Sequence, residues 1–276
     1  MIQISGSSFK LNDAWQLGST EKTIIEHMEN DSTPYSYYSA DEFLFEIKVR
    51  TNIIKSAKEM DKGESPFTSF ENAQCNPKYW QLTSTGGFML RPNVQPAEAI
   101  QDIFTNSSLY GFECATACVI IYYHAILNSI GAALFNILFQ NLYLYSWHTD
   151  SDLGLITFYS YHILPGDVVY FKNPDFHPQT PWFRGLNAVV LEDGKFFGHG
   201  FSIRDSDQIV QILNERRKPS SQNNAYLSNL VSRPSFNYLA KFISRQTQNT
   251  RTKIQRPILH HNKSSISYVQ YLYHLI

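Results

Sequence analysis

An uncharged stretch over residues 114–149 constrains the fold of this 276-residue chain more than any other feature. It contains no Asp, Glu, Lys or Arg, so it belongs either in a protein core or in a membrane. Polar side chains interrupt it every few residues and are costly to bury in hydrocarbon: His124, Asn128, Ser129, Asn136, Gln140 and Asn141. We therefore predict two buried helices, over about 113–128 and 131–141, and no membrane contact.

Charge is distributed unevenly along the chain. The formal net charge is −1, from 23 basic and 24 acidic residues. From Arg216 onward there are ten Lys and Arg and no acidic residue, which leaves 13 basic against 24 acidic residues before it. The basic end either docks on an acidic surface or is simply solvated. We predict a catalytic domain over 1–245 and a basic, acid-free tail over 246–276, and we expect no nucleic-acid partner.

The cysteine count indicates reduced thiols. Cys75, Cys114 and Cys118 are too few, and odd in number, for a disulfide framework, which points to a cytosolic protein. The polar N-terminal segment lacks the apolar core of a secretion signal. Cys114 and Cys118 have no second pair at zinc spacing, so we expect neither a metal nor a cofactor.

Local patterns predict helices followed by strands. Ser39 and Glu42 have the form of a capping box, which predicts a helix over about 40–60 with an exposed face that includes Glu46. We expect a short helix over 96–105, a strand over 167–171, and a hairpin turning at Asp193-Gly194. Ser206 is expected to cap a helix reaching about 218. This order predicts an α+β fold with a central antiparallel sheet packed by helices.

Cys114 and His199 are the residues that most suggest chemistry. Cys114 lies at the predicted start of a helix, whose dipole favours a thiolate. His199 lies in a predicted strand between Gly198 and Gly200, which leave room for a substrate. A cysteine at a helix start followed by a histidine on a strand is the arrangement of papain-like thiol enzymes. The structural alternatives are a small apolar residue at a helix start and a histidine buried in the core.

No acidic partner for the histidine is evident in the predicted hairpin. If Asp193-Gly194 sets the register, Ala188 lies opposite His199, and Leu186 and Val190 share its face. Asn187 then falls on the other face. Glu113, beside the cysteine, either complements the helix dipole or orients the imidazole.

Four ordered motifs resemble the protein-glutamine gamma-glutamyltransferases of endospore-forming bacilli. They are Tyr110–Ala117 (YGFECATA) followed by VIIYY, Pro165–Pro174 (PGDVVYFKNP), Arg184-Gly185, and Phe197–Gly200 (FGHG). The resemblance runs from about residue 35 to 245. It implies a single-domain, calcium-independent transglutaminase with a papain-like core, and we expect a monomer. It further implies action on glutamine and lysine side chains of spore-coat proteins, in the mother cell and then in the coat.

The resemblance also implies a mechanism. Cys114 would attack a glutamine side-chain amide, His199 would protonate the departing ammonia, and a lysine amine would resolve the thioester. Glu113 joins them as a third candidate catalytic residue. An aromatic channel would keep water from the thioester, and its candidate residues are Phe67, Phe70, Trp147, Trp182 and Phe183.

One departure from the family pattern puts the activity level in question. The family carries a glutamate after Arg-Gly, the acid partner of its histidine, whereas Leu186 follows Arg184-Gly185 here. Loss of an orienting carboxylate costs on the order of 10⁴ in turnover when nothing replaces it. Two alternatives to a transferase therefore remain open. One is a catalytically impaired coat component that is retained for binding, and the other is a thiol amidase whose acyl intermediate is hydrolysed by water.

Overall fold

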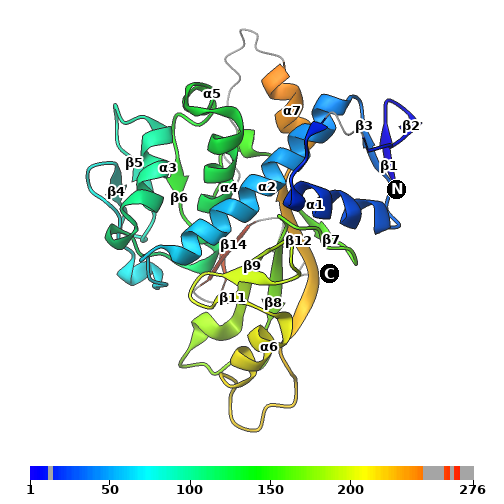
Figure 1. Cartoon of the computed structure of the whole chain (residues 1–276). Coiled ribbons are helices and arrows are strands. Elements are labelled where there is room, and N and C mark those ends of the chain that lie inside the picture. The colour runs from blue at the N-terminus through cyan, green and yellow to red at the C-terminus, as the bar shows by residue number, and fades with distance from the viewer. Residues whose placement is uncertain (12–14, 245–257, 262–263, 268–276) are drawn as a thin grey trace.

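A six-stranded antiparallel sheet organises the protein. The computed structural model describes residues 1–11, 15–244, 258–261 and 264–267 (Figure 1). The strand order is β11-β10-β9-β8-β12-β7, and every neighbouring pair is antiparallel. The strands are β7 (Leu155–Tyr159), β8 (Val168–Lys172), β9 (Gly185–Val190), β10 (Phe196–Gly198), β11 (Ser202–Arg204) and β12 (Tyr226–Pro234).

Helices lie on both sides of this sheet. They are α1 (Ser19–Asn30), α2 (Ala40–Lys62), α3 (Pro96–Thr105), α4 (Cys114–Ile130), α5 (Ala132–Leu138), α6 (Ser206–Asn214) and α7 (Phe236–Ser244). Two small sheets combine β1 (Ile2–Ile4), β2 (Ser7–Ser8) and β3 (Tyr35–Tyr37), and β4 (Trp80–Leu82), β5 (Phe88–Leu90) and β6 (Tyr143–Leu144). The described part of the predicted tail is a hairpin of β13 (Ile258–His261) and β14 (Ser264–Ser267).

Alternation along the strands places apolar side chains on both faces of the large sheet. Val168 and Val189 belong to the main core, which includes the buried faces of α2 and α4. Their neighbours Val169 and Ala188 belong to a second cluster with Ile209 of α6. In Figure 1, α2 crosses the middle of the molecule, the sheet lies below it, and α6 lies at the bottom. The predicted α+β fold with a helix-packed antiparallel sheet is confirmed.

Helix α2 confirms the predicted helix and corrects its exposed face. The Ser39 side chain accepts from the backbone N–H of Glu42 at 3.2 Å, as the capping pattern predicts. The prediction that Glu46 is exposed was wrong, because its carboxylate accepts from Arg50 Nε at 2.8 Å inside the core. Arg50 also donates to Asp167 Oδ1 at 2.9 Å. Glu46 is thus a charged residue that is buried together with its ion-pair partner, Arg50.

The uncharged stretch forms one buried helix and one half-exposed helix. Helix α4 is buried along nearly its whole length and ends at Gly131, which has a φ of 81°. Helix α5 is shorter than predicted and buries only Phe135 and Leu138, while Ile137 is 64% exposed. Among the described residues, no helix combines the length and apolar character that a bilayer crossing requires.

Three predicted details of the hairpin and of the helix that follows it were wrong. The helix expected to reach 218 ends at Asn214, and its cap is Asp205, whose capping box with Gln208 leaves Ser206 inside the helix. In the hairpin, Gly198 rather than His199 lies opposite Ala188. The Leu191 N–H donates to the Lys195 carbonyl at 2.8 Å, so the loop has three residues instead of two. Such loops take a left-handed residue last, and Gly194 has a φ of 77°.

Candidate active site

Cys114 is the first residue of α4, and Glu113 caps that helix. The Glu113 carboxylate accepts from the backbone N–H groups of Ala115 and Thr116, each at 2.6 Å. It also accepts from the Thr116 hydroxyl at 2.7 Å. These bonds satisfy N–H groups that lack helical partners. They also hold the carboxylate beside the thiol of the next residue.

The expectation of a thiol activated by the helix dipole was wrong. The pKa of Cys114 is raised to about 12, first by burial and then by the charge of the neighbouring Glu113. Burial also raises the pKa of Glu113, although its hydrogen bonds, including one from the Cys114 thiol, oppose that effect. A helix terminus contributes only about 0.3–1 kcal/mol at most exposed sites. Desolvation and a carboxylate in contact outweigh it.

His199 is held by a different set of groups. Its side chain is buried, which lowers the pKa of the imidazole to about 4, while hydrogen bonds to the backbone of Pro66 and Phe112 act in the opposite direction. The ring stacks on that of Phe112, with centroids 4.6 Å apart and planes 21° apart. Its Nε2 is buried without a hydrogen-bond partner among the described residues.

Cys114 and His199, the two residues singled out from the sequence, are linked through residues 112–114 without bonding to each other. His199 stacks on Phe112, which precedes Glu113 and Cys114 in the chain. Within the described residues, the hydrogen bonds of the sulfur go to Glu113 and Asn187, and none goes to the imidazole. The basic group that the thiol contacts is therefore the Glu113 carboxylate and not the His199 imidazole.

Sequence reasoning missed Asn187, whose Nδ2 lies 3.6 Å from Cys114 Sγ. The expectation that this side chain falls on the face away from the site was wrong, because the three-residue loop shifts the hairpin register by one. With Gly198 opposite Ala188, the residue opposite His199 in the continued register is Asn187. The sequence Glu192-Asp193-Gly194 is the signal that could have identified the longer loop.

Four of the five candidate channel aromatics have exposed surface. Phe67 and Phe70 are half-buried, and the Phe67 ring centroid lies 6.4 Å from that of His199. Trp182 is half exposed in the short 3-10 helix Pro181–Arg184. Its neighbour Phe183 is half-buried and packs against the same apolar cluster as Cys114. Trp147 differs from them, because it is 4% exposed and belongs to the main core.

Leu186 is 1% exposed and belongs to the apolar cluster against which Cys114 packs. Its side chain lies so close to Gly198 that a Cβ there would come within 2.5 Å of Leu186 Cδ2. The position at which the motif resemblance leads us to expect a glutamate is thus filled by a tightly packed apolar side chain. Glu113 is the carboxylate in contact with the thiol.

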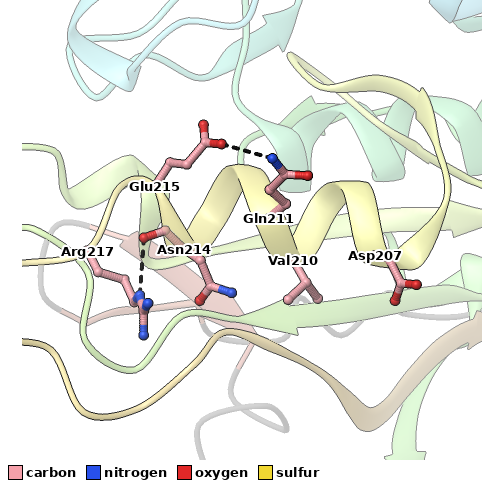
Figure 2. A pocket seen from close by; sticks show the side chains of 6 residues that line it. All are labelled: Asp207, Val210, Gln211, Asn214, Glu215 and Arg217. Carbon is pink, nitrogen blue, oxygen red and sulfur yellow. Dashed lines mark hydrogen bonds between the residues drawn. The ribbon is translucent and has the colours of Figure 1, made fainter.

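A pocket elsewhere on the surface lies along α6. Figure 2 shows the residues that line it, Asp207, Val210, Gln211, Asn214, Glu215 and Arg217, none of which is a predicted site residue. Two hydrogen bonds tie its walls, from Gln211 Nε2 to Glu215 Oε1 at 3.2 Å and from Arg217 Nε to the Asn214 carbonyl at 3.1 Å. In the part of the chain that the structure describes, no group of three or more His, Cys, Asp or Glu is placed to hold a metal ion.

Comparisons with known proteins agree with the motifs. The sequence model of the family described as protein-glutamine gamma-glutamyltransferase matches residues 1–243. A protein of that name from Halalkalibacterium halodurans is 52% identical over 276 residues, covering 100% of this chain and 97% of the relative. One from Bacillus mycoides is 42% identical and covers 87% of each chain.

A solved structure gives the same result. The transglutaminase from Geobacillus stearothermophilus, without its C-terminal extension, is 46% identical and superposes with a TM-score of 0.71, covering 74% of this chain and 98% of that one. Sequence and structure therefore agree on a single family of transferases. The chain belongs to the protein-glutamine gamma-glutamyltransferase, or transglutaminase, family of enzymes.

Proposed function

We propose that Cys114 is the nucleophile that attacks the side-chain amide of a protein glutamine. Ammonia leaves, a thioester remains on the sulfur, and a lysine amine resolves it to a gamma-glutamyl-lysine bond. The position of Glu113 carries this proposal, because a thiol that resists ionisation needs a base close by. The hydrogen bonds from Ala115 and Thr116 hold the Glu113 carboxylate at the start of α4, beside Cys114.

Glu113 is that base in the proposed mechanism. Its raised pKa suits a group that takes the thiol proton and then gives it to the departing ammonia. The family resemblance assigned this work to His199. The contacts favour Glu113, because the imidazole bonds to backbone carbonyl groups and stacks on Phe112. His199 acts as a positioning residue that fixes the segment leading to Glu113 and Cys114.

Partly exposed aromatic side chains separate the thioester from water in this proposal. Phe67 beside His199, and Trp182 and Phe183 beside the cluster that packs Cys114, are the residues that support it. Phe70, whose ring centroid lies 4.7 Å from that of Tyr145, is a further candidate for this role. Trp147 supports the core instead. Exclusion of water gives a lysine amine the advantage over hydrolysis.

Leu186 lowers the activity in this proposal but does not abolish it. The apolar side chain removes one carboxylate from the surroundings of the thiol, while Glu113 remains in contact. The alternatives of an impaired coat component and a thiol amidase differ from the transferase in their products.

The biological setting rests on the family resemblance. We propose spore-coat proteins as substrates, the mother cell and then the coat as location, a monomer, and no requirement for calcium. The family match ends at residue 243, which supports a catalytic domain over 1–245 and a separate basic segment over 246–276.

One assay tests the proposal and separates the alternatives. The purified full chain is incubated with a glutamine-rich protein and a labelled primary amine, and incorporated label and released ammonia are both followed. We expect label and ammonia together, and neither with Cys114→Ala. Cys118→Ala, which removes the buried thiol one turn further along α4, serves as the control. Ammonia without label identifies an amidase, and neither product in the wild type identifies a binder.

A further inference from the structure

Asn187 presents two donors to the nucleophilic sulfur. Its Nδ2 lies 3.6 Å from Cys114 Sγ, and its backbone N–H also donates to that atom. The two residues are 73 positions apart and come from β9 and α4. Asn187 is 8% exposed, and its contact with the sulfur is partly buried. Amide donors to a sulfur anion are charge-assisted hydrogen bonds, which are stronger than neutral ones.

The backbone N–H of Asn187 is available to the sulfur because β10 ends before it reaches the position opposite this residue. In an antiparallel ladder, every second N–H points to the same neighbouring strand. Leu191 donates toward the β10 side, to the Lys195 carbonyl, so Val189 and Asn187 point their N–H groups the same way. The last pair between these strands joins Gly198 to Ala188. Asn187 lies one step beyond it, where the sulfur takes the place of a strand partner.

We propose that Asn187 is a catalytic residue whose two N–H groups hold the sulfur as it becomes a thiolate. The proposal rests on the proposed function. In the first step the S–H bond breaks, its proton goes to the Glu113 carboxylate, and the electron pair stays on sulfur facing Asn187. The sulfur then bonds to the amide carbon of the substrate glutamine. When the C–N bond breaks, ammonia leaves with the proton from Glu113, and the thioester remains.

The surroundings of the sulfur explain why such donors are needed. Among the described residues, three ionisable groups interact with it: Glu113 at the cap of the same helix, Cys118 one turn further along, and Tyr170 from β8, the register partner of Asn187. None of the three carries positive charge. Burial and the Glu113 carboxylate disfavour the thiolate, and the two Asn187 donors act in the opposite direction.

Alkylation of Cys114 by iodoacetamide tests the proposal without any substrate, because the rate at a fixed pH is proportional to the thiolate fraction. We expect Asn187→Leu, which keeps the shape and loses the side-chain donor, to lower the rate at pH 8 by about tenfold. Mass spectrometry of the Cys114 peptide separates it from Cys75 and Cys118. Asn187→Ser also removes the amide with less bulk and is expected to lower the rate.

Tyr170→Phe is the matched control, since it removes a polar atom from the strand partner without removing a donor to sulfur. We expect it to alkylate at the wild-type rate. Wild-type alkylation in both Asn187 variants overturns the proposal, even where amine incorporation falls, because the amide then acts on something other than the thiolate. Continued amine incorporation by Cys114→Ala defeats the proposed function instead and leaves the alkylation result to decide the role of Asn187.

Discussion

Arg50 of α2 and Asp167, the residue before β8, form an ion pair in which neither side chain has exposed surface, with Nη1 2.9 Å from Oδ1. The other oxygen of Asp167 pairs with Arg233 Nη2 at 2.6 Å and accepts from the Leu164 N–H at 2.9 Å. One carboxylate thus joins α2 to two adjacent strands of the large sheet. Strand β8 pairs directly with β9, which carries Asn187.

Removing the charge of Asp167 should destabilise the fold. We expect Asp167→Asn to lower the free energy of unfolding by about 3–5 kcal/mol, because Arg233 then loses its buried counter-ion and Arg50 keeps only Glu46. Urea denaturation measures the change. As a control, Lys195→Met removes a partner of the exposed pair between Lys195 and Asp193, 4.0 Å apart, and should cost under about 1 kcal/mol. A loss for Asp167→Asn as small as that of the control contradicts the prediction.

Replacing Glu113 should impair chemistry more than folding. We expect Glu113→Gln to lower amine incorporation by about 10²–10⁴-fold, because the amide cannot take the thiol proton. Its single side-chain oxygen can still accept from one of the two N–H groups that Glu113 caps, so we expect only a modest fall in the thermal midpoint. His199→Gln is the comparison, and we expect it to retain more activity. The opposite ranking of the two variants would restore His199 as the base.

Restoring a carboxylate at Leu186 should raise the activity. We expect Leu186→Glu to increase amine incorporation while lowering the thermal midpoint, since the side chain is 1% exposed among apolar neighbours. Leu186→Gln introduces a side chain of the same shape as glutamate but without its charge. It should lower the thermal midpoint without increasing amine incorporation. Equal rates in the wild type and in Leu186→Glu would show that the leucine does not limit turnover.

Opening the aromatic surface should divert the thioester to water. We expect Phe183→Ala to raise the ratio of released ammonia to incorporated amine by several-fold, because water then reaches the acyl group. Quantifying both products in one reaction gives this ratio. Ile137→Ala, at an exposed apolar position on α5, should leave it unchanged. A lower rate at a constant ratio would mean that Phe183 serves binding or packing instead.

Buried histidines should make stability fall in mild acid. Burial lowers the pKa values of His124 and His199 from 6.5 to about 4 in the folded protein. The unfolded chain therefore binds more protons between these values, and stability is lost as the pH falls from about 6.5 to 4. We expect His124→Gln to flatten this dependence by up to about 1.4 kcal/mol per pH unit in denaturation measured across the range. If the free energy of unfolding of His124→Gln depends on pH as steeply as that of the wild type, the prediction for His124 is wrong.

Local patterns in the sequence were enough for several elements. The Ser39 cap, the uncharged stretch and the turn at Asp193-Gly194 located α2, α4 and the hairpin, because caps, periodicity and turn residues act over a few positions. The strands β7 and β12 were not predicted. Strand β12 lies between β8 and β7 only because residues far apart in the chain pair there.

The sequence by itself determined the family, the fold class and the position of Cys114 at a helix start, since ordered motifs and local propensities are properties of the chain. Tertiary structure decided the pKa of the Cys114 thiol and the side chains that contact it. Burial and the contact with Glu113 reversed the expected direction of the thiol pKa, and a one-residue change of loop length turned Asn187 toward the sulfur. Desolvation and strand register depend on groups that meet only in the folded protein, so no local pattern specifies them.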